Sequence, residues 1–166
     1  DGVVQLTNLL SHYQNLDTLH IVSHGSAGTV QLGISELSAE TLDSYSTQLQ
    51  SWSSSFAENA DILLYGCNIA DGAAGLDFIE RFAQATSADV GASSDDTGTA
   101  VLGGDWDLEV QTGDVDTHSL DLADYDGVLA GLEYADLRTW SEAGYLGGNW
   151  NVSADGRTVY QDVNTS

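Results

Sequence analysis

The chain has 166 residues, of which 42% are apolar. This is enough for one domain with a buried core, and it excludes disorder throughout. The chain carries 26 acidic residues and three basic ones, all arginines, so its formal net charge is −23. Such a charge repels phosphate backbones and anionic lipid headgroups, which argues against nucleic-acid and membrane-surface partners. It suits a solvated surface in salty water and favours cations, above all Ca²⁺.

Helical and strand patterns alternate along the first two thirds of the chain. In chain order they predict a helix over residues 2–14, a strand over 16–23, a short hairpin or loop over 30–37, a long helix over 39–58, a strand over 61–65, a helix over 71–86 and a strand over 89–93. Alternating apolar residues from Trp106 to Val110 predict an antiparallel edge strand. This order predicts a three-layer α/β sandwich with a mostly parallel sheet and helices on both faces.

The pattern changes near residue 131, which divides the chain into three predicted parts. Residues 1–130 are predicted to form the α/β domain, and residues 131–148 are predicted to be a linker of mixed composition. Residues 149–166 alternate like a β-hairpin around Asp155-Gly156. Because two strands alone are marginally stable, we interpret the last part as the start of a truncated β-rich domain.

His24 and Cys67 each follow directly after a predicted buried strand. If these strands are parallel neighbours, both residues lie at the carboxyl edge of the sheet, where ligands bind in such folds. A cysteine nucleophile needs a base and donors for a developing oxyanion. In this interpretation Cys67 attacks a carbonyl, His24 protonates the leaving amine, and the amides of Gly25 and Cys67 hold the oxyanion.

Other interpretations of these residues remain open. Cys67 is the only cysteine, so no internal disulfide is possible, and a lone cysteine is often a small buried residue. His20 lies within its strand, and we interpret it as structural. A zinc site from His20, His24 and Cys67 lacks the usual ligand spacing.

The segments HIVSHGSAG and DILLYGCNIADGAAG resemble the two signatures of caspase-like (clan CD) cysteine peptidases, with the His-to-Cys interval close to the ~50 residues of caspases. Together with GGDWDLE and YDGVLA, they more closely resemble the domain of unknown function DUF4347. That family occurs near the N-termini of very large bacterial surface proteins with adhesive repeats. The resemblance implies a caspase-like fold and an extracellular or cell-surface location.

The same resemblance implies that strands precede the first helix, so the sheet is expected to be incomplete at the N-terminus. It favours a cysteine endopeptidase that acts on a peptide or protein substrate, including its own chain. The alternative is an inert structural or adhesive module beside other domains of the same polypeptide. Asp95 and Asp96 follow the third strand, and we expect them to bind a basic side chain of the substrate, which makes Arg138 and Arg157 candidate self-processing sites.

No cofactor is required by this interpretation, although Ca²⁺ remains a candidate ligand. Pairs and groups of aspartates that suit a hard cation are Asp105 and Asp107; Asp114 and Asp116; and Asp121, Asp124 and Asp126. None has the spacing of an EF-hand loop. The tail, NWNVSADGRTVYQDVNTS, resembles the first strands of the thrombospondin C-terminal lectin-like sandwich, a Ca²⁺-associated module. The longest apolar run is too short for a membrane span, so no membrane insertion is expected.

Overall fold

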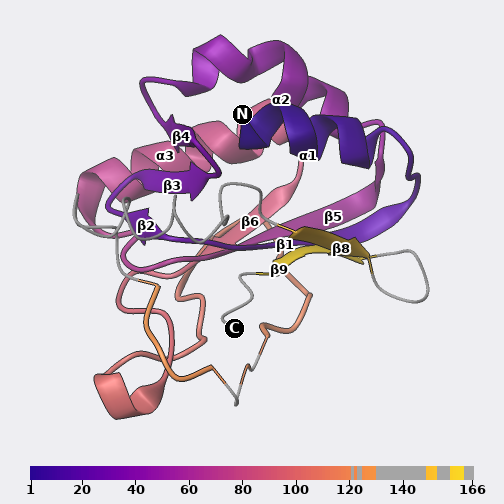
Figure 1. Ribbon diagram of the computed structural model, residues 1–166. Coiled ribbons are helices and arrows are strands. Elements are labelled where there is room, and N and C mark those ends of the chain that lie inside the picture. The colour runs from indigo at the N-terminus through magenta and orange to yellow at the C-terminus, as the bar shows by residue number, and fades with distance from the viewer. Residues whose placement is uncertain (121, 123–124, 130–148, 153–157, 163–166) are drawn as a thin grey trace.

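A six-stranded sheet with the order β7-β6-β5-β1-β9-β8 runs through the centre of the computed structural model (Figure 1). The structure describes residues 1–120, 122, 125–129, 149–152 and 158–162. The helices are α1 (Gly2–Leu10), α2 (Ser46–Trp52) and α3 (Gly72–Thr86), with 3₁₀ turns η1 (Leu42–Tyr45) and η2 (Ala100–Leu102). The strands are β1 (Leu16–Val22), β2 (Gly25–Ser26), β3 (Thr29–Leu32), β4 (Ser35–Ser38), β5 (Phe56–Tyr65), β6 (Asp89–Ala92), β7 (Val110–Thr112), β8 (Asn149–Val152) and β9 (Thr158–Asp162).

The central sheet is mostly parallel, as the sequence predicts. β1 pairs in parallel with β5, and β5 with β6, through the helical crossovers that parallel strands require. β7 closes one side of the sheet antiparallel to β6. The short strands β2, β3 and β4 form a separate antiparallel sheet. Within it, β3 and β4 make the short hairpin that the sequence predicts, with a loop as the alternative, over residues 30–37.

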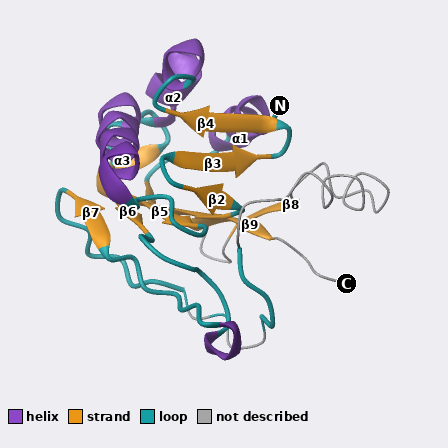
Figure 2. Ribbon diagram, turned by 90° about the vertical axis from the view of Figure 1, so that its left-hand side faces the viewer, coloured by secondary structure: helices purple, strands orange, loops and turns teal. Residues whose placement is uncertain are grey.

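The two faces of the central sheet are covered differently. Alternate residues of the inner strands, such as Leu19, Ile62 and Val90, face one side and join the main apolar core with the inward faces of α1, α2 and α3. Val22, Leu63 and Tyr65 belong to a second cluster, covered by partly buried side chains of the extended chain in residues 106–108, 115–120 and 125–128. Figures 1 and 2 show the helices gathered on one side and this extended chain, with η2, on the other. The protein is therefore an α/β sandwich whose second outer layer is largely extended chain.

The predicted helix over residues 39–58 is wrong in its extent. The helical chain ends at Trp52, and Phe56 already begins β5. Three consecutive serines explain the stop, because serine hydroxyls compete for backbone hydrogen bonds. Ser53 and Ser54 donate back to the Gln50 and Ser51 carbonyls, and Ser55 donates to the Leu10 carbonyl of α1 at 2.8 Å.

The second edge of β1 is paired with β9. The sheet was expected to be incomplete beside β1, but β9 lies parallel to β1 there, with Thr18 opposite Thr158. β8 continues the sheet antiparallel to β9, which confirms the hairpin predicted in the tail. Residues 131–148 lie outside the described part of the chain, so the division into domains stays a prediction.

Candidate functional site

The ends of β1 and β5 bring His24 and Cys67 to the same edge of the sheet. Val22 lies opposite Tyr65 in the parallel register, and the Ser23 amide donates to the Tyr65 carbonyl at 2.9 Å. His24 and Cys67 follow two residues after this matched pair. The glycine at position 66 permits this close approach, because a Cβ there would lie 2.7 Å from the Ser23 carbonyl oxygen and 3.1 Å from the Gly25 nitrogen. The two turns therefore pack backbone to backbone.

Two backbone amides at this edge point to a single oxygen atom. The Gly25 amide donates to the Leu129 carbonyl at 3.4 Å, and the Cys67 amide donates to the same oxygen at 3.3 Å. These are the two amides that the sequence predicts as oxyanion donors. Amides that converge on one carbonyl oxygen are the arrangement that stabilises negative charge in acyl transfer.

The Cys67 thiol is buried in the second apolar cluster. Its residue is 1% exposed and packs among Val22, Leu63, Tyr65 and Leu129. The thiol donates to the Thr97 carbonyl at 3.7 Å. Burial is the main cause that raises the pKa of the Cys67 thiol, to about 11, and the charge of Asp96 acts in the same direction. The thiol is therefore protonated at neutral pH in this conformation and needs a base to react.

Asp95 and Asp96 follow β6 and lie beside the cysteine turn. The Asn68 amide donates to the Asp95 carbonyl at 2.7 Å, and the Asn68 side chain donates to the Asp96 carboxylate at 3.2 Å. The Asp96 carboxylate is close enough to Cys67 to act on its thiol, whereas the Asp95 carboxylate belongs to a different group of acids. The catalytic roles of His24, Gly25 and Cys67 and the substrate-binding roles of Asp95 and Asp96 stay predictions.

His20 occupies a separate, buried position on β1. The Leu120 amide donates to the Tyr65 hydroxyl at 2.8 Å, and this hydroxyl lies 3.2 Å from His20 Nδ1. Because the hydroxyl accepts from Leu120, it can donate its own proton to Nδ1, which places the imidazole proton on Nε2. Burial lowers the pKa of His20 to about 4, so this side chain is neutral at physiological pH.

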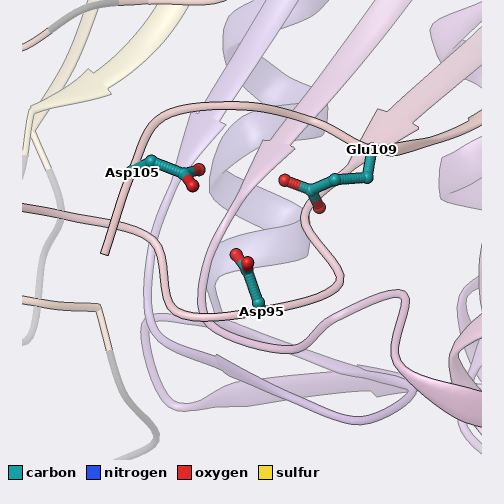
Figure 3. Close-up of side chains that lie close together, drawn as sticks. All are labelled: Asp95, Asp105 and Glu109. Atoms are coloured by element: carbon teal, nitrogen blue, oxygen red, sulfur yellow. The ribbon is translucent and has the colours of Figure 1, made fainter. Parts of the chain in front are cut away.

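Three carboxylates gather on the loops that follow β6 and precede β7. The ligand oxygens of Asp95, Asp105 and Glu109 lie within 4.8 Å of one another, and all three residues are exposed (Figure 3). Partial burial first, and then the charges of Glu109 and Asp105, raise the pKa of Asp95. Oxygen ligands at this spacing suit a cation such as Ca²⁺, although exposed acidic groups are common without one.

The substitution Glu109→Gln is expected to raise the melting temperature by about 1–2 °C in calcium-free, low-salt buffer. It removes one of three like charges, and its amide oxygen can still accept from the Ser94 amide, which lies 2.7 Å from the present carboxylate. The gain should disappear in 1 M NaCl because salt screens exposed charges. Glu36→Gln, an exposed change on β4, is the control, and an equal gain there would contradict this explanation.

Sequence reasoning missed Thr97, Gly98 and Leu129. Thr97 and Leu129 contribute the carbonyls that meet the Cys67 thiol and amide. Leu129 belongs to the YDGVLA segment, which is one of the segments that resemble the family. Nothing in the pattern of that segment predicts that its backbone contacts the turn at Cys67.

Next to this region, a cavity of about 430 Å³ has Thr99, Trp106 and Tyr125 among its lining residues.

Comparison with models of known protein families identifies the family of this chain. The family model described as domain of unknown function DUF4347 matches residues 1–129. Neither the curated proteins nor the solved structures contain a match. Within the described residues, the helices are too short or too polar to cross a bilayer. Since the match covers most of its length, the chain belongs to the DUF4347 family.

Proposed function

We propose that this chain is a caspase-like cysteine endopeptidase domain of a large, secreted, acidic bacterial surface protein. Cys67 is the nucleophile, His24 is the base and later the acid, and the Gly25 and Cys67 amides hold the oxyanion. One observation carries the proposal: these two amides donate to the same carbonyl oxygen, that of Leu129. A pair of preorganised donors next to a cysteine is what acyl transfer requires.

The surroundings of the thiol support the same chemistry. His24 and Cys67 follow matched positions of two parallel strands, which is where α/β folds place reacting groups. The thiol is protonated at neutral pH, so the proposed reaction depends on proton transfer to His24 during attack. The substrate is a peptide segment, and no cofactor takes part.

Hydrolysis of peptide bonds that requires both Cys67 and His24 is the expected result. The test incubates the full chain with a mixture of fluorogenic peptides and measures cleavage of these peptides and of the chain itself. Cys67→Ala should abolish cleavage, and His24→Ala should slow it by about 10²–10⁴-fold. His12→Ala, at an exposed position after α1, is the matched control. Cleavage that persists in Cys67→Ala, or no cleavage of any substrate, would falsify the proposal.

An inert structural or adhesive module is the second candidate function. The specific observation in its favour is that Cys67 is 1% exposed and its pKa is raised to about 11, as in a structural cysteine. In that case iodoacetamide labels Cys67 only after unfolding, and His24→Ala leaves both labelling and chain integrity unchanged. This outcome would favour the module over the peptidase.

The extracellular or cell-surface location is proposed from the net charge of −23 together with the family. A strongly acidic surface keeps a protein soluble in salt and repels nucleic acids, and it attracts cations such as Ca²⁺. Other domains of the same polypeptide are the proposed neighbours. Brief treatment of intact cells with an external protease should remove the protein, and full protection until the cells are lysed would contradict a surface location.

A further inference from the structure

The Leu129 carbonyl oxygen lies where the proposed site would hold the reacting carbonyl of a substrate. Both proposed oxyanion donors, the Gly25 and Cys67 amides, are bonded to this one oxygen, at 3.4 and 3.3 Å. A segment of the chain that lay elsewhere on the surface would accept a hydrogen bond from neither amide. The chain therefore presents one of its own peptide groups to the proposed catalytic site.

The residues that precede this carbonyl are bound as an added β-strand. The Leu129 amide donates to the Thr97 carbonyl, and the Thr99 amide donates to the Gly127 carbonyl, both at 2.8 Å. Gly98 and Val128 form an antiparallel bridge between these bonds. A Cβ on Gly98 would lie 2.3 Å from the Gly127 oxygen, so glycine is needed for this approach. Extended binding with alternating main-chain bonds is how proteins hold peptide ligands by strand addition.

The Leu129 side chain fills an apolar site beside the nucleophile. Leu129 is 1% exposed and packs with Val22, Leu63, Tyr65 and Cys67. The Thr97 carbonyl accepts from both the Cys67 thiol and the Leu129 amide, so the sulfur and the segment meet at one oxygen atom. The segment also explains the burial of Cys67, because Leu129 is part of the cluster that covers the thiol.

We infer that the chain cleaves itself between Leu129 and residue 130, with Gly127–Leu129 as the bound substrate segment. This inference rests on the proposed function and names its substrate. The thiol proton passes to His24, and the sulfur bonds to the Leu129 carbonyl carbon. The carbon–nitrogen bond to residue 130 then breaks, and His24 gives its proton to the released amine. Water hydrolyses the thioester, which leaves a carboxylate on Leu129 and restores the thiol.

The extent of the family supports this choice of bond. The DUF4347 match ends at residue 129, so the bound segment is part of the family's domain. Arg138 and Arg157, which the sequence suggests as processing sites, lie outside the described residues. Leu129 differs from them because its backbone contacts both proposed oxyanion donors.

The test compares the full chain with its Cys67→Ala variant by intact mass after incubation at neutral pH. The wild type should give two fragments, one that ends at Leu129 and one that begins at residue 130, while Cys67→Ala stays whole. The measurement must be made under denaturing conditions, because β9 pairs with β1 and would hold the fragments together. A cut at the same bond in Cys67→Ala would mean that a contaminating protease makes it, and the inference would be wrong.

A second pair of variants tests the apolar site. Leu129→Ala keeps the main-chain hydrogen bonds and removes the buried side chain, so cleavage should slow by at least about 10-fold. Leu122→Ala, at an exposed leucine that precedes the bound segment, should leave cleavage at the wild-type rate. Equal rates for the two variants would contradict the inference. If Leu129→Ala fails to fold, the fragment masses of the wild type still identify which bond is cleaved.

The outcomes separate this inference from the proposed function. Cleavage that depends on Cys67 but occurs at another bond, or only in added peptides, overturns the inference and leaves the proposed function standing. No cleavage that depends on Cys67, in the chain or in added peptides, overturns both.

Discussion

Replacing Trp52 with alanine is expected to lower the free energy of unfolding by about 3–5 kcal/mol, with a fall in melting temperature of about 10 °C. Trp52 ends α2 and is 0% exposed. Its ring packs edge-to-face against Phe82 of α3, with the ring centres 6.1 Å apart, and its indole Nε1 donates to Thr7 Oγ1 of α1 at 2.8 Å. One side chain therefore joins α1, α2 and α3, and its loss leaves a cavity among them.

Thermal unfolding followed by circular dichroism measures this loss. Leu102→Ala is the matched control, because it also removes a large apolar side chain but from a position that is 58% exposed. Its effect should stay within about 0.5 kcal/mol, as for most surface changes. A loss below 1 kcal/mol for Trp52→Ala would show that α1, α2 and α3 are not packed as described.

Acid is expected to destabilise the protein by about 3 kcal/mol through His20 alone. Burial lowers the pKa of this imidazole from its usual 6.5 to about 4. Each tenfold change in proton affinity is worth about 1.4 kcal/mol. In the unfolded chain His20 takes up a proton below pH 6.5, whereas the folded protein resists this until about pH 4. The contribution of neutral His20 is therefore complete above pH 6.5 and is lost as the pH falls towards 4.

The His20→Gln variant isolates this effect, because it removes the titrating group and its amide oxygen can accept from the Tyr65 hydroxyl. The free energy of unfolding, measured by urea titration at pH 7 and pH 4.5, should fall less in the variant than in the wild type. His12→Gln, at an exposed position, should keep the wild-type pH dependence. Parallel pH profiles for wild type and His20→Gln would rule out the explanation.

Local sequence patterns were sufficient for most of the fold. Buried parallel strands such as β1 and β5 are apolar on both faces, and the stripe of Phe78, Ile79 and Phe82 marks α3. One exception is residues 53–56, where an apolar residue at helical spacing, Phe56, belongs to a strand. Periodicity cannot detect this, because the serine hydroxyls that end the helix contribute nothing to an apolar pattern. Another exception is the expectation of helices on both faces of the sheet, because the described α-helices lie on one face.

The candidate site was predictable in its two strand ends but not in what covers them. His24 and Cys67 follow from the rule that neighbouring parallel strands end at one edge. The return of residues 127–129 to that edge depends on hydrogen bonds with Gly25, Cys67 and Thr97, which are distant in the sequence. Such pairings leave no periodic signal, and the same is true of β9, whose partner is β1.

The pairing of β9 with β1 has a consequence for the order in which the protein forms during synthesis. β1 leaves the ribosome well before β9, which lies near the end of the described chain. At a synthesis rate of ~5–20 residues per second, the edge of β1 that pairs with β9 stays unpaired for on the order of ten seconds. During that interval its unpaired amides are open to neighbouring nascent chains, so we expect early termination products to aggregate more readily than the full chain.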